Sequence, residues 1–191
     1  MTNSSTDRRV RKTKRMLKQA LTKLLMEKEL KDLSVLELTE LADLNRGTFY
    51  LHYRDIYDLY EQVENGILNE FNIIIKRHLS QNPHGIPFPL VLNALEFLAE
   101  NADVCMAILR TNDTAFLSKL IEMNKPEDTR GWQALFGRKN EGLYEYYYSY
   151  ITSGCVGLLR SWFMGGMKEP PAKMAALAEK IMSGSIGHRE A

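Results

Sequence analysis

The sequence predicts an all-helical protein, in which a small N-terminal domain over residues 1–60 is joined by one long helix to a larger helical domain over residues 61–191. Apolar residues recur at helical spacing along most of the chain, whereas the alternating pattern of strands is scarce. Signals for helix starts occur repeatedly within about twenty residues of the N-terminal part, which indicates short helices and tight turns. The rest of the chain is long enough for a second helical core.

The first short helix is predicted from a capping box. Ser34 can accept a hydrogen bond from a free amide of the first turn, and Glu37 three residues later can reach back toward the cap. Leu33 and Leu38 flank the cap as a hydrophobic staple. The polar residues of the segment 43–45 then predict a turn that ends this helix.

A second short helix is predicted over residues 46–52. Asn45 is a good N-cap for it, and Gly47 would let the helix backbone approach another molecule closely. Asp55, followed by Asp58 at the third helical position, marks the start of the long connecting helix. Two short helices separated by a tight turn are typical of a helix-turn-helix unit.

The helix before this unit is predicted over residues 11–28. Its apolar stripe consists of Met16, Leu17, Ala20, Leu21, Leu24 and Leu25. Residues 1–26 hold eight Lys or Arg and one acid, a net charge of +7, although the whole chain carries only +1. A basic segment beside a helix-turn-helix indicates a protein that neutralises phosphates. The alternative is a solvated, disordered tail.

The stretch Thr13–Leu59 resembles the DNA-binding domain of TetR-type transcriptional regulators, a three-helix unit followed by a long connecting helix. The strongest part of the resemblance is RGTFYLHYRD, residues 46–55. A looser resemblance covers YEYYYSYITSGCVGLLRSWFMGGM, residues 144–167, which is similar to the penultimate helix of the regulatory domain in one subgroup of the family.

The resemblance implies a role for each matching residue. The expected DNA contacts are Ser34, Asn45, Arg46, Gly47, Thr48, Tyr50 and His52. Arg46 would read base edges in the major groove, since a guanidinium can pair bidentately with guanine. Tyr50, His52 and the cap of the first short helix would contact phosphates, although a histidine in His52's place would by itself more often be a surface or packing residue. Phe49 and Tyr53 are expected to pack inward.

Two positions depart from the family pattern. Ile56 stands where the family often has a lysine, and Asp43 replaces a commoner glycine in the turn. The loss of a cation at residue 56 would weaken the grip on phosphates. This departure and the near-neutral total charge motivate an alternative, in which the protein has lost operator binding and acts by contacting another protein.

The remaining helices follow from apolar periodicity and from Gly and Pro breaks. They are predicted over residues 56–79, 90–99, 104–109, 114–123, 144–163 and 172–182, with breaks at residues 82–89 and an irregular connection over residues 125–142.

The last two predicted helices offer a partner surface. Gly154 and Gly157 in the middle of a helix cost about 1 kcal/mol each relative to alanine, and the close approach of a second helix would compensate. The resemblance implies a four-helix bundle between two copies of the chain. The expected interface residues are Tyr144, Tyr148, Gly154, Gly157, Trp162, Leu177 and Ile181. The alternative is an ordinary intramolecular core.

The resemblance also implies a small-molecule effector site in the C-terminal domain. Its candidate residues are Phe97, Met106, Phe116 and Tyr147. Aromatic residues and methionine at helical spacing are more often simply core, so the alternative is again ordinary packing.

Several function classes lack support in the sequence. His78, His84 and His188 are scattered without the spacing of metal ligands, so neither a metal nor another cofactor is expected. No phosphate loop or nucleophile motif is present, and we expect no catalytic residue and no enzyme activity. Cys105 and Cys155 should be reduced thiols, and neither a signal segment nor a membrane span is found, which predicts a cytoplasmic protein.

Together with these features, the resemblance implies a TetR-like homodimer that binds a near-palindromic operator in double-stranded DNA and represses transcription, with a small molecule as its expected effector. Two recognition helices separated by roughly 34 to 36 Å would address successive major grooves.

Overall fold

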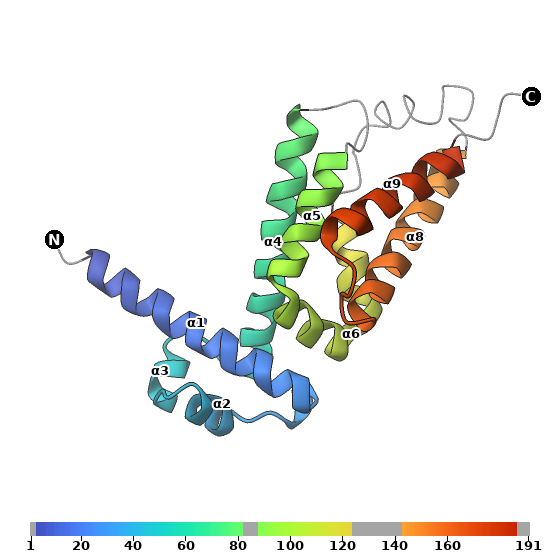
Figure 1. The fold of residues 1–191 in the computed structure, drawn as a ribbon. Helices are drawn as coiled ribbons and strands as arrows, with labels where there is room; N and C mark the ends of the chain where they lie inside the picture. The colour runs from blue at the N-terminus through green and yellow to red at the C-terminus, as the bar shows by residue number, and fades with distance from the viewer. Residues whose placement is uncertain (1–2, 82–87, 124–142, 187–191) are drawn as a thin grey trace, which may run out of the picture. The chain divides into compact units, whose positions relative to one another are not determined.

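The computed structural model describes residues 3–81, 88–123 and 143–186, and every regular element in these ranges is helical (Figure 1). The elements are α1 (Asn3–Glu27), the 3-10 helix η1 (Leu30–Asp32), α2 (Val35–Leu41), α3 (Arg46–Tyr50), α4 (Ile56–Gln81), α5 (Phe88–Glu100), α6 (Ala102–Glu122), α8 (Tyr144–Met164) and α9 (Pro171–Ile186). The predicted all-α class is confirmed. Residues 82–87 of the expected break and the connection over residues 125–142 lie outside the described residues. Helix α5 begins at Phe88, so the last two residues of the expected break, 88 and 89, are helical.

The chain divides into two compact units. The first contains Met1–Ile67 and Asp103–Asp113, and the second contains Leu68–Ala102 and Thr114–Ala191. Helices α4 and α6 therefore contribute to both units. The first unit extends beyond residue 60 and includes a segment from the middle of the chain that the sequence pattern did not indicate.

The core of the first unit is built on α1. Five of the six residues of its predicted apolar stripe are buried and Met16 is half-buried, with Leu17 and Leu21 almost fully inaccessible to solvent. The same core contains Leu38 from α2, Phe49 from α3 and Leu59 from α4. Helix α6 adds Ala107, so five helices share one apolar cluster, which holds the two short helices in place although neither would be stable alone.

Helix α1 begins at Asn3, earlier than the predicted residue 11. The segment 8–15 contains neither Gly nor Pro, and Arg and Lys are good helix formers. The basic segment is therefore a helical extension of the packed part of α1, and the alternative of a disordered tail is wrong for residues 8–15.

The predicted caps of the two short helices are confirmed. The Ser34 hydroxyl accepts a hydrogen bond from the backbone N–H of Glu37 at 3.2 Å, and Asn45 Oδ1 accepts one from the N–H of Gly47 at 2.7 Å. The Glu37 carboxylate, which the capping box would direct back to the cap, pairs instead with the Lys28 ammonium on the far side of η1. Helix α3 ends at Tyr50 and is thus shorter than predicted.

Helix α6 runs without interruption over residues that were predicted to form two helices, 104–109 and 114–123. The sequence between them is polar, which suggested a break. Thr111 is accommodated within the helix because its hydroxyl donates to the carbonyl oxygen of Ala107, one turn earlier, at 3.1 Å. The prediction of two helices is therefore wrong.

The second unit has its own core between α5, α8 and α9. Leu95, Trp162, Met174 and Ala175 form its buried centre, and the Trp162 indole N–H donates to the Glu169 carbonyl oxygen at 2.9 Å. Among the described residues, no helix combines the length and apolarity that crossing a membrane requires.

Candidate nucleic-acid interface

Helix α3 is only five residues long and is anchored by a single buried side chain. Phe49 is fully buried, and its ring lies 5.3 Å from that of Tyr50 in an edge-to-face arrangement and 5.7 Å from that of Tyr53. Burial raises the pKa of the Tyr53 phenol, and the nearby Asp58 charge adds to this. The inward packing expected of Phe49 and Tyr53 is confirmed, and the opposite face of α3 is left to solvent.

Five of the seven residues expected to contact DNA are exposed to solvent. Ser34, Asn45, Arg46, Gly47 and Tyr50 are exposed, whereas Thr48 and His52 are half-buried. Tyr50 is 59% exposed although it is a large aromatic residue. An exposed guanidinium and an exposed phenol on one short helix can contact base edges and phosphates without any repacking of the core.

Gly47 has a local structural role that its motif did not reveal. A Cβ atom at this position would lie 3.3 Å from Asn45 Oδ1, the oxygen that caps α3. A side chain here would therefore crowd the cap, so glycine both preserves the cap and leaves the first turn of α3 open to an approaching molecule.

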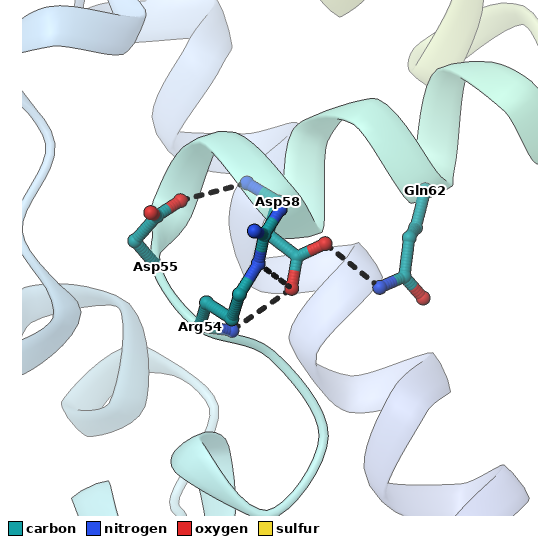
Figure 2. A network of polar contacts seen from close by, with 4 residues as sticks. All are labelled: Arg54, Asp55, Asp58 and Gln62. Carbon is teal, nitrogen blue, oxygen red and sulfur yellow. Dashed lines mark hydrogen bonds and ion pairs between the residues drawn. The ribbon is translucent and has the colours of Figure 1, made fainter.

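The start of α4 is fixed by a network of four residues (Figure 2). Asp55 Oδ1 accepts from the Asp58 N–H at 2.8 Å, which confirms the predicted cap. Asp58 in turn accepts from the backbone N–H of Arg54 at 2.8 Å and from the side-chain amide of Gln62 at 3.0 Å. These two hydrogen bonds, the one from Arg54 first, lower the pKa of the Asp58 carboxyl. The network ties the end of the helix-turn-helix to the long helix.

Ile56, where the family often has a lysine, belongs to the apolar core of the first unit. Only 5% of its surface is exposed, and it packs in the same cluster as Phe49 and Leu59. The apolar residue at this position therefore contributes packing to the helix-turn-helix.

A second set of polar side chains lies on α1. Arg8, Arg9, Arg11, Lys12, Lys14 and Arg15 are all exposed. The Lys14 ammonium lies 5.8 Å from the centroid of the Tyr53 ring, within the range of a cation–π contact. The sequence pattern identified these cations as a charged segment but not as site residues. The signal that could have done so is the absence of a helix breaker between them and the packed part of α1.

The residues expected at an effector site are divided between the two units. Phe97 and Phe116 are buried in the second unit, where Tyr147 is half-buried. Met106 is half-buried but belongs to the first unit. Within the described residues no group of His, Cys, Asp or Glu is arranged to hold a metal ion.

The residues expected at a dimer interface fall into two groups. Tyr148 and Trp162 are buried within the chain itself, whereas Gly154, Gly157, Leu177 and Ile181 are exposed. The side chain of Tyr144 lies outside the described residues. The exposed face of α8 also includes Tyr146 and Tyr150, which are 75% and 68% exposed and were not among the predicted residues.

The sequence and structural comparisons identify the family. A family model described as a transcriptional regulator C-terminal region of the TetR type matches residues 87–184, just over half of the chain. The chain belongs to the TetR family of transcriptional regulators. No match is found among curated protein sequences.

Two solved structures are similar to this TetR-family chain along nearly its whole length. One is described as the dihydroxyacetone kinase operon activator DhaS, with 15% identity, a TM-score of 0.57, and coverage of 94% of this chain and 98% of that one. The other is described as the fatty acid degradation regulator FadR from Bacillus halodurans, with 16% identity, a TM-score of 0.58, and coverage of 93% and 97%. At this identity the similarity shows the fold.

Proposed function

We propose that this TetR-family protein is a DNA-binding transcriptional repressor that binds a near-palindromic operator as a homodimer. The observation that carries the proposal is the exposed face of α3, on which Arg46 and Tyr50 project from a helix anchored by the buried Phe49. A rigid helix that presents one guanidinium and one phenol has the chemistry needed to read a base edge and to hold a phosphate.

The proposed dimer is supported by the exposed face of α8 and α9. Tyr146, Tyr150, Leu177 and Ile181 expose apolar surface. A Cβ atom at Gly154 or Gly157 would meet nothing within 4 Å in the single chain. No close contact within one protomer therefore offsets the helix-propensity cost of these two glycines. A second copy that packs closely against them would offset it. Such a dimer has two recognition helices, as a two-fold symmetric site requires.

The proposed effector site lies in the second unit, with Phe97, Phe116 and Tyr147 as its candidate residues. A small molecule that controls this protein must bind one arrangement of the two recognition helices more tightly than the other, since equal affinity shifts no equilibrium. An operator-binding protein must be in the compartment that contains its DNA, so we propose a cytoplasmic location.

The alternative is a TetR-like protein that has lost operator binding and contacts another protein. It was motivated by the missing cation at Ile56 and by the near-neutral total charge. Ile56 is buried in the core of the first unit, so packing accounts for an apolar side chain there without a loss of operator binding. The exposed cations on α1 also favour DNA, which is a polyanion, over a protein as the binding partner. Operator binding is therefore the better-supported function.

The test is selection of bound duplexes from a random DNA library at near-physiological salt, with Arg46→Ala and Tyr50→Ala run beside the wild type. We expect enrichment of a near-palindromic site. Arg46→Ala should relax the sequence preference at one position of each half-site, at a cost of about 1–3 kcal/mol. Tyr50→Ala should weaken binding to all sequences uniformly, because it removes a phosphate contact.

Glu96→Ala is the matched control, because this exposed residue lies on α5, outside both the helix-turn-helix and the proposed dimer face. It should leave the selected sequence unchanged. If the folded wild-type dimer enriches no sequence, the operator-binding proposal is wrong and the protein-contact alternative takes its place.

A further inference from the structure

The first turns of α1 form a cationic arm on the first unit. We define the arm as residues 8–15, RRVRKTKR, in which six of eight residues are Arg or Lys and none is acidic. The packed residues of α1 begin only at Met16 and Leu17. In Figure 1 the N-terminal turns of α1, drawn in dark blue, extend past α2 and α3 of the same unit.

Four of the arm's cations occupy one face of the helix. Arg8, Arg11, Lys12 and Arg15 follow the spacing i, i+3, i+4, i+7, and all four are exposed. At 3.6 residues per turn this face lies opposite Leu17, which is buried in the core of the unit. The packing of α1 therefore fixes the direction of the cationic face.

This charge density is unfavourable for the isolated protein. Like charges at i, i+3 and i, i+4 repel one another along a helix. Among the described residues the arm's cations make a single ion pair, between Arg11 and Asp7 at 3.5 Å, and both side chains are largely exposed. The arm is thus a stretch of helix that folding alone does not explain, and a polyanion would remove its self-repulsion.

The partner chemistry that fits the arm is the phosphate backbone of duplex DNA. Val10 is the only large apolar residue in the segment 8–15, so the arm has no apolar face that could insert into a lipid surface. A row of exposed cations at successive helix turns can neutralise several phosphates of a duplex. The arm also belongs to the same compact unit as the recognition helix α3.

We infer that the arm is a second DNA-binding element, in which Arg8, Arg11, Lys12 and Arg15 bind backbone phosphates outside the bases read by α3. This inference rests on the proposed DNA-binding function and extends it. The arm supplies affinity that does not depend on sequence, whereas α3 supplies the sequence preference. Because each phosphate contact releases counterions, the arm also sets much of the salt dependence of binding.

The test compares the wild type with a variant that carries Arg8→Gln, Arg11→Gln, Lys12→Gln and Arg15→Gln. Binding is measured over a range of salt concentrations on two duplexes of equal length, one with the site enriched by selection and one of mixed sequence. We expect the variant to bind both duplexes more weakly by the same factor, about tenfold or more, with a salt slope lower by about 0.9 for each phosphate that it no longer neutralises. The melting temperature should not fall, because self-repulsion is relieved.

The matched control removes the same charge from the second unit by changing four exposed cations to glutamine. These are Lys76, Arg77, Lys168 and Lys173. The control should bind both duplexes as the wild type does. An arm variant that is folded and keeps the wild-type affinity and salt slope would overturn the inference, as would equally weakened binding by the control, which would indicate a general charge effect.

Failure of the arm can be told apart from failure of the operator proposal. Arg46→Ala should weaken binding to the enriched duplex alone, whereas the arm variant should weaken binding to both. If the wild type binds duplexes without sequence preference, the operator proposal is wrong. The inference about the arm is then still tested by comparing the wild type with the quadruple glutamine variant. If the wild type binds no duplex, both are wrong.

Discussion

At the scale of single residues, Asp43 explains why the family often has glycine in the turn of the helix-turn-helix. Asp43 has a φ of 52°, in the left-handed region. It follows the C-cap Ala42, and its N–H donates to the Glu40 carbonyl while the Leu44 N–H donates to that of Thr39. This is a Schellman motif, whose left-handed position favours glycine because a Cβ atom is strained there.

The position therefore gives a direct stability prediction. Asp43→Gly should raise the free energy of unfolding by up to about 1 kcal/mol, because relief of the left-handed strain outweighs the added freedom of the unfolded chain. Asp43→Val should lower it, since a β-branched residue tolerates this conformation worst. Denaturant titration of the three proteins measures the order, and a glycine variant less stable than the wild type would contradict the explanation.

At the scale of elements, local chemistry in the sequence was enough wherever a cap decides the structure. The hydroxyl of Ser34, the amide of Asn45 and the carboxylate of Asp55 each accept the amide that their position predicts. These contacts span three residues or fewer, so a window of sequence contains all of their determinants. The bounds of α6 could not be predicted in this way, because a run of polar residues in the sequence looks like a helix break. The run stays helical where a side chain hydrogen-bonds to the helix backbone, as Thr111 does with the Ala107 carbonyl.

The sequence motif predicted the candidate DNA-binding residues, but it did not predict the contacts that hold them in place. The exposed face of α3 follows from the register of residues 46–52. The role of Gly47 depends on a 3.3 Å approach to Asn45 Oδ1, and the fate of Ile56 depends on packing with distant parts of the chain. Such distances arise only when the chain is folded, so no sequence pattern contains them.

The N-cap of α3 allows its structural role to be separated from its proposed role in binding. Asn45→Asp keeps a side-chain oxygen for the Gly47 N–H and should leave the free energy of unfolding nearly unchanged, whereas Asn45→Ala should lower it by about 1 kcal/mol. The aspartate adds a negative charge beside the proposed phosphate contacts, so it should weaken duplex binding more than alanine does. Thermal melting and binding titrations on the same samples check both parts, and an aspartate variant that binds as tightly as wild type would contradict the placement of the cap at the interface.

At the scale of the whole molecule, the all-α class and the order of the helices were predictable because apolar periodicity extends over nearly every helix. The membership of the segment Asp103–Asp113 in the first unit was not, since it depends on contacts between residues far apart in the sequence. The burial of Tyr148 and Trp162 within the chain likewise narrows the proposed dimer face to the exposed residues of α8 and α9.

Operator binding by a dimer makes a prediction about the geometry of protection on DNA. Two recognition helices related by a two-fold axis should protect two equivalent half-sites, one helical turn of about 10–10.5 base pairs apart. Replacing Gly154 and Gly157 by leucine should separate the protomers, because the added side chains would fill the space that the second copy is proposed to occupy. This variant should lose joint protection of the two half-sites while keeping its helical circular dichroism spectrum.

The most direct measurement is a hydroxyl-radical footprint of the wild type and of Gly154→Leu/Gly157→Leu on the duplex enriched by selection. We expect the wild type to protect two symmetric patches on one face of the duplex, and the variant to protect them only at much higher protein concentration. A wild-type footprint with a single patch, or with no protection on any duplex, would contradict the proposal that this protein regulates transcription as an operator-bound dimer.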